Sequence, residues 1–147
     1  MPHISETIAI AADHAGVDLK AQLVKELSAL GFTPLDLGTH STESVDYPDY
    51  AHALAKELAS GKATRGIIIC GTGIGISIAA NRHKHIRAAL CHGSLEAKLA
   101  RKHNDANVLA LGARIIGIES AKDAMRAFLS TEFEGGRHKN RVEKIEL

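Results

Sequence analysis

Aromatic residues are scarce in this sequence: phenylalanine, tyrosine and tryptophan make up 3% of its 147 residues, and tryptophan is absent. Such a chain has few flat side chains on which nucleic-acid bases could stack. An excess of one charge is lacking as well, because 18 lysines and arginines nearly balance 17 aspartates and glutamates and leave a formal net charge of +1. We therefore expect neither nucleic acid nor an anionic membrane surface as a partner.

Cysteines and long apolar runs are also few. The two cysteines, Cys70 and Cys91, are too few for a disulfide-stabilised fold and suit a reducing compartment. No apolar run approaches the roughly 20 residues of a membrane-spanning helix. The first residues, Met1–Glu6, lack the basic-then-apolar layout of a secretory signal. We therefore expect a cytoplasmic protein without a membrane segment.

What the sequence does contain is a regular alternation of strand-like and helix-like segments. Strands are predicted at Thr7–Ala12, Thr33–Leu37, Ile67–Cys70, Ile86–Cys91 and Asn107–Leu111. Helices are predicted from Val17 to a stop at Gly31, from Pro48 to Gly61, over residues 74–81, from a cap at Ser94 to about Asn104, over Glu119–Leu129, and from about Arg137 to Leu147. This alternation predicts one α/β domain over residues 1–147, a doubly wound, Rossmann-like parallel sheet of five strands in three α/β/α layers. The pattern does not predict the strand order.

The stretch Gly66–Asn81 is the most informative part of the chain. Three isoleucines, Ile67–Ile69, are typical of a strand buried on both faces of a parallel sheet, and this strand ends at Cys70. Glycine then occupies every second position of Gly71–Gly75, so the backbone can take positive φ and bring its N–H groups close to a ligand. A thiol beside bare amides and a helix N-terminus predicts a site for an anion or a developing oxyanion.

Two common glycine-rich motifs do not fit this loop. A dinucleotide-binding fingerprint that begins with Gly71 and Gly73 would need glycine at position 76, which is Ile76. A P-loop needs lysine and then serine or threonine after its last glycine, whereas Gly75 is followed by Ile76 and Ser77. A plain tight turn between a strand and a helix needs one glycine rather than three, which favours a functional loop.

Other polar residues follow the ends of the predicted strands, where ligands bind in such sheets. Asp13 and His14 come after the first strand, and Arg114 lies beyond the fifth. Two interpretations of Asp13 and His14 stay open: a helix cap with a surface imidazole, or a pair of ligand-binding side chains. Cys91 also ends a strand, but no glycine-rich loop follows it, so we interpret it as a small buried hydrophobe.

Some polar residues lie away from the predicted strand ends. Arg137 and Arg141 share a face of the terminal helix, where cations near the N-terminus oppose the helix dipole; a solvated helix start or an anionic ligand such as phosphate would each explain them. His103 and Asn104 at a helix end fit a simple C-cap. The run Arg82–Arg87 has two histidines but no further ligand at metal-binding spacing. We interpret it as a solvated loop and predict no metal site.

Taken in order, these motifs resemble those of the type B ribose-5-phosphate isomerases, whose family includes allose- and galactose-6-phosphate isomerases. The matching motifs are Asp13-His14, Asp46-Tyr47-Pro48, Cys70–Ser77 with Ala79-Ala80-Asn81, His103-Asn104-Asp105, and Gly135-Gly136-Arg137-His138 with Arg141. They extend from the first strand to the terminal helix, nearly the whole chain. Their order and spacing, rather than any single motif, carry the resemblance.

The resemblance implies an isomerase, without metal or cofactor, that interconverts ribose 5-phosphate and ribulose 5-phosphate through an enediolate, as in the pentose phosphate pathway. Carried over by position, Cys70 would move the proton between C2 and C1, and His103 would assist ring opening. The other implied roles are Thr72 with the amides of Gly71, Gly73, Ile74 and Gly75 for the enediolate oxygens, Asp13 and Asn104 for sugar hydroxyls, Tyr47 for substrate contact, and His14, Arg114, Arg137 and Arg141 for the phosphate.

The family's alternative base is a glutamate just after the glycine loop. That position is Ile76 here, which accepts no proton, so Cys70 is the only candidate. The resemblance further implies a homodimer, with a tetramer as a further option, in which His103, Asn104 and Arg114 reach into the partner's pocket. Two alternatives stay open: an isomerase of a six-carbon aldose 6-phosphate, and a non-catalytic sugar-phosphate sensor. A sensor would need the amides and arginines but not the thiol.

Overall fold

The computed structural model describes residues 5–147 of the chain. At its centre is a parallel sheet of five strands in the order β2-β1-β3-β5-β4. The strands are β1 (Thr7–Ala12), β2 (Thr33–Asp36), β3 (Arg65–Cys70), β4 (Ala88–Leu90) and β5 (Val108–Gly112). The predicted five-stranded α/β fold is confirmed, and the structure adds the strand order.

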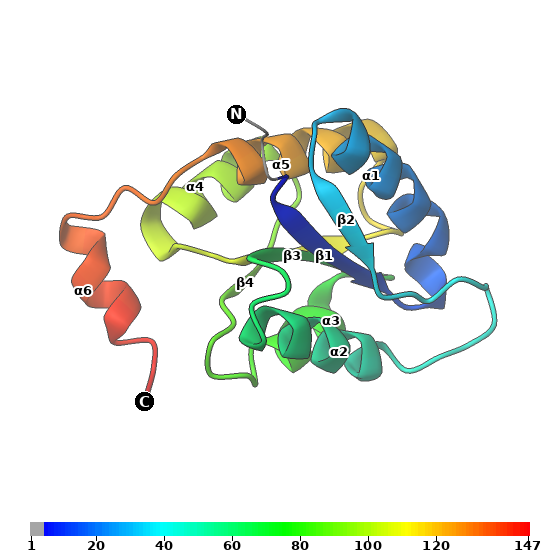
Figure 1. The fold of residues 1–147 in the computed structure, drawn as a ribbon, viewed down its shortest axis with the longest axis horizontal. Coiled ribbons are helices and arrows are strands. Elements are labelled where there is room, and N and C mark those ends of the chain that lie inside the picture. Colours follow the sequence, from blue (N-terminus) through cyan, green and yellow to red (C-terminus); the bar gives the residue numbers. More distant parts are fainter. Residues whose placement is uncertain (1–4) are drawn as a thin grey trace.

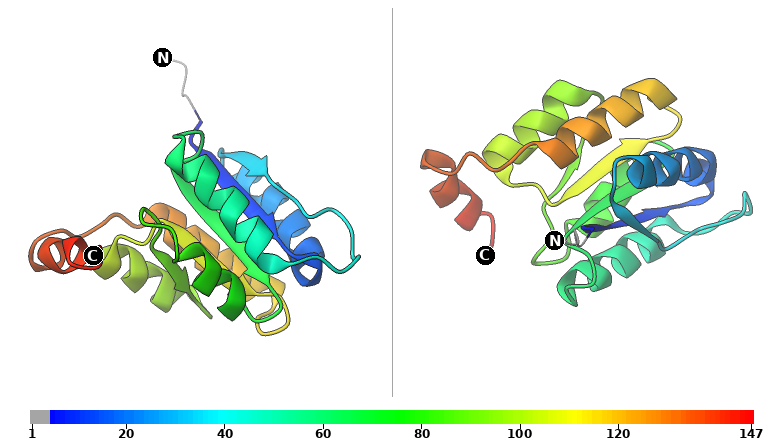
Figure 2. Two further views of the ribbon diagram at one scale, coloured as in Figure 1. Left: turned by 90° about the horizontal axis from the view of Figure 1, so that it is seen from below. Right: turned by 45° about the horizontal axis from the view of Figure 1, so that its top comes forward.

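Helices cover both faces of this sheet, as Figure 1 and Figure 2 show. The elements are a 3₁₀ turn η1 (His14–Gly16) and the helices α1 (Val17–Ala29), α2 (Tyr47–Ala59), α3 (Ile74–Ala80), α4 (Ser94–Asn104), α5 (Ile118–Ser130) and α6 (Arg137–Glu143). Helices α1, α4 and α5 pack on one face, and α2 and α3 on the other. The last helix, α6, stands beyond the end of α4, at the opposite end of the molecule from η1 (Figure 1).

The three isoleucines of β3 explain why the sheet holds a core on each side. Ile67 and Ile69 point into the core under α1, α4 and α5, whereas Ile68 points into the core under α2 and α3. All three are fully buried. Burial of each such side chain contributes about 1.5–3 kcal/mol, so this strand anchors both layers.

Several predicted boundaries were wrong, most of them by one or two residues. β4 is shorter than Ile86–Cys91, because the backbone N–H of Arg87 donates to the Asn107 side chain and the ladder begins only at Ala88. Gly93, not Ser94, is the N-cap of α4; no side chain caps this helix. The terminal helix ends at Glu143 rather than at Leu147, and the residues beyond it are exposed.

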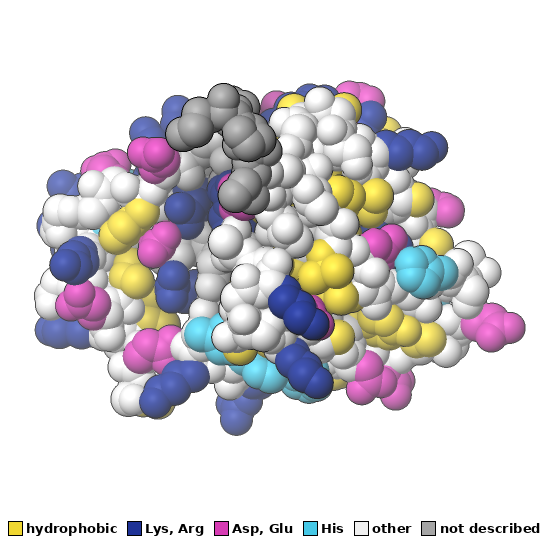
Figure 3. All heavy atoms as spheres, viewed as in Figure 1, with side chains coloured by type: hydrophobic (Ala, Val, Ile, Leu, Met, Phe, Trp, Pro, Cys, Tyr) yellow, Lys and Arg dark blue, Asp and Glu magenta, His cyan; other side chains and the backbone are white. Residues whose placement is uncertain are grey.

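The surface agrees with the balanced composition. Figure 3 shows acidic and basic side chains interspersed over one face of the molecule. Within residues 5–147, no helix combines the length and the apolar character that a membrane crossing requires.

The strand order places the predicted ligand site at a switch point of the sheet. β1 and β3 are neighbours, and from them the chain winds outward in opposite directions, to β2 on one side and to β5 and β4 on the other. In such sheets a crevice opens at the carboxyl ends of the two central strands. Asp13 follows β1 and Cys70 ends β3, and the backbone N–H of Asp13 donates to the carbonyl of Ile69 at 3.1 Å.

Candidate active site

The thiol of Cys70 lies against the glycine loop that follows it. The backbone N–H of Gly73 donates a hydrogen bond to the Cys70 Sγ atom at 3.2 Å, and the cysteine is only 4% exposed. Gly73 is the N-cap of α3, so this donor belongs to the positive end of the helix dipole. The sulfur thus lies at the N-terminus of α3, with a backbone N–H directed at it.

Glycine at position 73 is required for this geometry. Its φ is +80°, a conformation that side chains other than glycine rarely adopt. A Cβ atom there would also lie 2.5 Å from Cδ1 of Leu90 and 2.8 Å from the carbonyl carbon of Leu111. The loop is thus pressed onto the ends of β4 and β5, which fixes the direction of its N–H groups.

Thr72 and Tyr47 also lie at this loop. The Thr72 hydroxyl accepts a hydrogen bond from the backbone N–H of Ile74 at 3.2 Å, and Ser77 donates to the carbonyl of Ile74 at 2.7 Å. A Cβ atom on Gly75 would lie 2.6 Å from Cζ of Tyr47, so the tyrosine ring from α2 rests directly on the loop. The Thr72 hydroxyl and the Tyr47 ring therefore both contact the glycine loop.

Asp13 and His14 lie beside Cys70 at the switch point. The Asp13 carboxylate accepts from the backbone N–H of Ala15 at 3.0 Å and so caps η1, while Asp13 itself is 6% exposed. His14 Nδ1 accepts from the backbone N–H of Val45 at 3.2 Å, which leaves its Nε2 to carry the proton. The cap interpretation of Asp13 is thus correct, and it holds the two side chains at the crevice.

Arg114 lies over the glycine loop of its own chain. Its backbone N–H donates to the carbonyl of Gly71 at 2.9 Å, and a Cβ atom on Gly71 would lie 3.2 Å from its Nη1 atom. This differs from the expectation that Arg114 reaches into a partner's pocket. The exposed guanidinium instead adds positive charge to the same site as Cys70.

The remaining predicted residues gather at the other edge of the sheet. Helix α4 starts at the carboxyl edge and runs back, so His103 and Asn104 at its end lie far from Cys70 of the same chain. They line a cavity of about 270 Å³ together with His138, Arg141, Val142 and Ile145. Arg137 begins α6 beside them. Within one chain the predicted residues therefore form two separate groups, one with the thiol and one with His103 and the α6 arginines.

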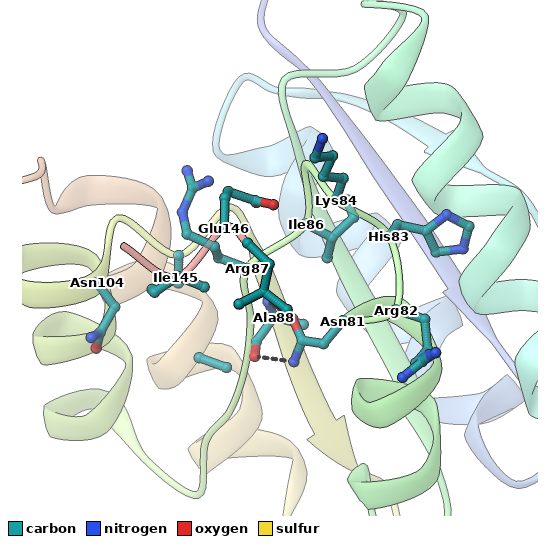
Figure 4. Close-up of a pocket in the computed structure, with 13 residues that line it drawn as sticks. Asn81, Arg82, His83, Lys84, Ile86, Arg87, Ala88, Asn104, Ile145 and Glu146 are labelled. Carbon is teal, nitrogen blue, oxygen red and sulfur yellow. Dashed lines mark hydrogen bonds between the residues drawn. The ribbon is translucent and has the colours of Figure 1, made fainter. Parts of the chain in front are cut away.

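A second cavity, larger than the one at His103, contains little of the proposed chemistry. It measures about 610 Å³ and lies between the loop after α3 and the last residues of the chain (Figure 4). Asn81 lies at its wall, where its side chain is hydrogen bonded to the backbone of Ala88 in both directions. Of the predicted site residues only Asn104 reaches this cavity, so we assign no catalytic role to it.

The second cysteine is inert, as expected. Cys91 is 1% exposed, and burial, with a smaller contribution from the Glu96 carboxylate, raises the pKa of its thiol to about 12. It therefore stays neutral at physiological pH and packs as a hydrophobe in the core under α4 and α5.

Two contacts between histidines were not predicted from the sequence. His52 of α2 lies 2.6 Å from His83 through their ring nitrogens, so the basic run after α3 has a third histidine beside it. The His138 ring stacks on that of His103 with centroids 4.5 Å apart, and its Nε2 lies 3.6 Å from the Glu134 carboxylate. The four-residue spacing of Glu134 and His138 was the one sign in the sequence that these two residues could meet. His103, which joins them, lies 31 residues before Glu134 in the chain.

A buried thiol, a glycine loop at a helix N-terminus and a switch point of the sheet are the layout of an α/β enzyme site. The model of the Ribose/Galactose Isomerase family matches residues 8–145, and the chain belongs to this family.

Its relatives match over nearly their full lengths. It is 49% identical to ribose-5-phosphate isomerase B of Escherichia coli over 94% of this chain and 93% of that protein. It is also 49% identical to D-erythrulose-4-phosphate isomerase of Pectobacterium atrosepticum, over 95% of this chain and 92% of that protein. Among solved structures, a ribose 5-phosphate isomerase from Thermotoga maritima superimposes with a TM-score of 0.94 at 51% identity, covering 96% of this chain and 97% of that one.

Proposed function

We propose that this protein is an aldose–ketose isomerase that interconverts ribose 5-phosphate and ribulose 5-phosphate. The observation that carries the proposal is the 3.2 Å hydrogen bond from the Gly73 amide to the Cys70 thiol at the switch point of the sheet. Binding alone would need no thiol at this position, whereas proton transfer next to a carbonyl needs a base and an oxyanion site together.

The reaction follows from these groups. With the sugar ring open, the Cys70 thiolate removes the proton from C2, and the electron pair moves toward the C1 carbonyl to give an enediolate. Amides of the glycine loop stabilise the negative oxygen, each by about 3–4 kcal/mol in comparable sites. The proton of the C2 hydroxyl passes to the C1 oxygen, and the thiol returns its own proton to C1, which leaves a C1 hydroxyl, a ketone at C2 and the Cys70 thiolate. Ile76, fully buried and apolar, offers no other base here.

A second copy of the chain would complete the site. Leu95 and Leu99 of α4 are 68% and 37% exposed, and His103 follows them at the same four-residue spacing. Residues four apart share one face of a helix, so His103 lies in line with an exposed apolar stripe. Ile74 and Ile78 form a matching stripe on α3, with 52% and 62% exposure, immediately after the glycine loop.

Burial of these two stripes against each other is the reason to expect a homodimer. Docking α4 of one chain onto α3 of its partner removes large apolar side chains from water. The same contact carries His103, Asn104 and the α6 arginines toward the partner's Cys70. Each composite site would then hold the thiol, the amides and Arg114 of one chain and the ring-opening histidine and phosphate-binding arginines of the other.

The chemistry also indicates where the enzyme works. Both cysteines are free thiols in the structure, and proton transfer requires Cys70 to remain one. A reducing compartment preserves such thiols, which is why we place the activity in the cytoplasm.

The test is a substrate series assayed with chelator present. We expect ribose 5-phosphate to be converted with a higher kcat/KM than D-erythrulose 4-phosphate or allose 6-phosphate. D-erythrulose 4-phosphate is the substrate in the name of an equally similar relative. A higher kcat/KM for this four-carbon sugar, or for the six-carbon sugar, would contradict the substrate assignment but not the reaction class. Binding of all three without turnover would overturn the enzyme and support a sensor.

A further inference from the structure

Three possible metal ligands meet at the end of α4. The ligand atoms of His103, Glu134 and His138 all lie within 4.8 Å of one another. Two imidazoles and one carboxylate are a common ligand set for Zn²⁺, which prefers nitrogen and oxygen donors in a tetrahedral arrangement. The complete set was not predicted from the sequence, because His103 lies at the end of α4 whereas Glu134 and His138 lie just before and within α6.

The backbone holds this cluster in place. The N–H of Glu134 donates to the carbonyl of Lys102 at 3.1 Å, which ties the carboxylate to the residue before His103. Gly135 and Gly136 then adopt φ of +70° and +57° and reverse the chain, so that His138 in α6 turns back over α4. A turn of this kind requires glycine.

His138 supplies the observation that points to a ligand. The residue is 5% exposed, and within the described part of the chain its buried Nε2 finds no hydrogen-bond partner. A buried polar atom without a partner costs about 1–3 kcal/mol, so such atoms normally bind something. The atom lies 3.6 Å from the Glu134 carboxylate, close to the roughly 3.4 Å between two donors on one tetrahedral zinc ion.

We propose that His103, Glu134 and His138 form a binding site for a divalent metal of the zinc type. His103 is half-buried and stacked on His138 with a ring angle of 20°. Metal binding would therefore require its ring to turn out of this stack. Water or an anion would occupy the fourth position, next to Arg141 in the same cavity.

The metal would inhibit the enzyme rather than assist it. This consequence rests on the proposed role of His103, because an imidazole bound to zinc cannot assist ring opening. Metal binding itself does not depend on that role. Zinc bound at this site would therefore inhibit an isomerase whose own proton transfer uses no metal.

The binding test uses the full-length protein after treatment with chelator. Titration with ZnCl2 by calorimetry, and with Co²⁺ by visible absorption, should show one tight site per chain and a tetrahedral cobalt spectrum. Glu134→Gln and His138→Asn should each weaken zinc binding by at least about tenfold. His52→Gln, which removes the other close histidine pair, should leave the affinity unchanged.

Glu134→Gln keeps the test valid even if the buried His138 variant fails to fold, because the Glu134 side chain is half exposed. Equal zinc affinity in Glu134→Gln and the parent protein would overturn the proposal, as would octahedral cobalt with no tight site.

Activity then separates this proposal from the function. With ribose 5-phosphate, zinc should inhibit the parent at the concentration that fills the site, and Glu134→Gln should need at least about tenfold more zinc for the same fractional inhibition. Tight binding without inhibition would support the metal site and contradict the role of His103. Equal inhibition of both proteins would overturn control through this site.

Discussion

The backbone N–H of Gly73, the N-cap residue of α3, donates a hydrogen bond to the sulfur of Cys70, 3.2 Å away. This relationship couples a base to an oxyanion site within four residues of chain. In the proposed reaction, the same N-terminus of α3 would serve both the sulfur and the negative oxygen of the substrate.

The coupling depends on the backbone conformation of Gly73. Gly73→Ala would force a Cβ atom into φ +80° and within 2.5 Å of Leu90, so we expect a loss of about 1–3 kcal/mol in unfolding free energy and at least tenfold in kcat. Thermal unfolding and steady-state kinetics measure both. The matched control is Gly117→Ala, whose φ is −79° and whose added Cβ meets no atom within 4 Å. Equal effects of the two substitutions would contradict this account of the loop.

The α6 arginines should act on phosphate binding. Arg137→Ala and Arg141→Ala each remove a charge-assisted partner worth about 1.5–3 kcal/mol, so inhibition by inorganic phosphate should weaken roughly tenfold to a hundredfold. Lys139→Ala, exposed in the same helix, should have little effect. If phosphate inhibits both arginine variants as it does the parent, α6 does not reach the substrate.

Mixing two inactive variants tests the composite site. Cys70→Ala and His103→Gln chains, unfolded and refolded together, would form mixed dimers with one intact site out of two. Random pairing gives half mixed dimers, so about a quarter of the parent activity should return. No recovery from a mixture shown to contain mixed dimers would mean that Cys70 and His103 serve separate sites.

An ion pair at the amino edge should make stability depend on pH. Hydrogen bonds from Arg65 hold the pKa of Glu6 below its usual 4.5. A lowered folded-state pKa stabilises the fold above the unfolded-state value, and this stabilisation is lost as the pH falls through the folded-state pKa.

Glu6→Gln should therefore lower the unfolding free energy by about 1 kcal/mol at neutral pH, and by less below about pH 4. Denaturant unfolding at both pH values measures the difference. Glu43→Gln, on an exposed loop, is the control. A Glu6→Gln effect that is the same at both pH values would show that the carboxylate charge contributes nothing.

The parts of the fold that depend on local pattern were predictable from sequence. Ile67–Ile69 marked a strand buried on both faces, and the glycine loop marked the N-terminus of α3. Element ends were less predictable where tertiary contacts decide them. The start of β4 depends on the Asn107 side chain, which takes the N–H of Arg87, a contact that spans 20 residues of chain.

The thiol half of the site was also predictable, because strand ends share one edge of a parallel sheet. The position of Arg114 over the glycine loop depends on the contact between the end of β5 and Gly71, which the spacing of residues in the sequence does not predict. The contact of His138 with His103 required the positive φ of Gly135 and Gly136 and the packing of α6 on α4. Distant contacts of this kind leave no periodic trace in the sequence.

The most direct test of the whole account is the turnover of ribose 5-phosphate by Cys70→Ala, measured together with phosphate inhibition of the same protein. Removal of a general base should lower kcat by about 10²–10⁴-fold. Inhibition by inorganic phosphate should stay within about twofold of the parent value, because the arginines are untouched. A variant that keeps its turnover within tenfold of the parent would show that Cys70 is not the base.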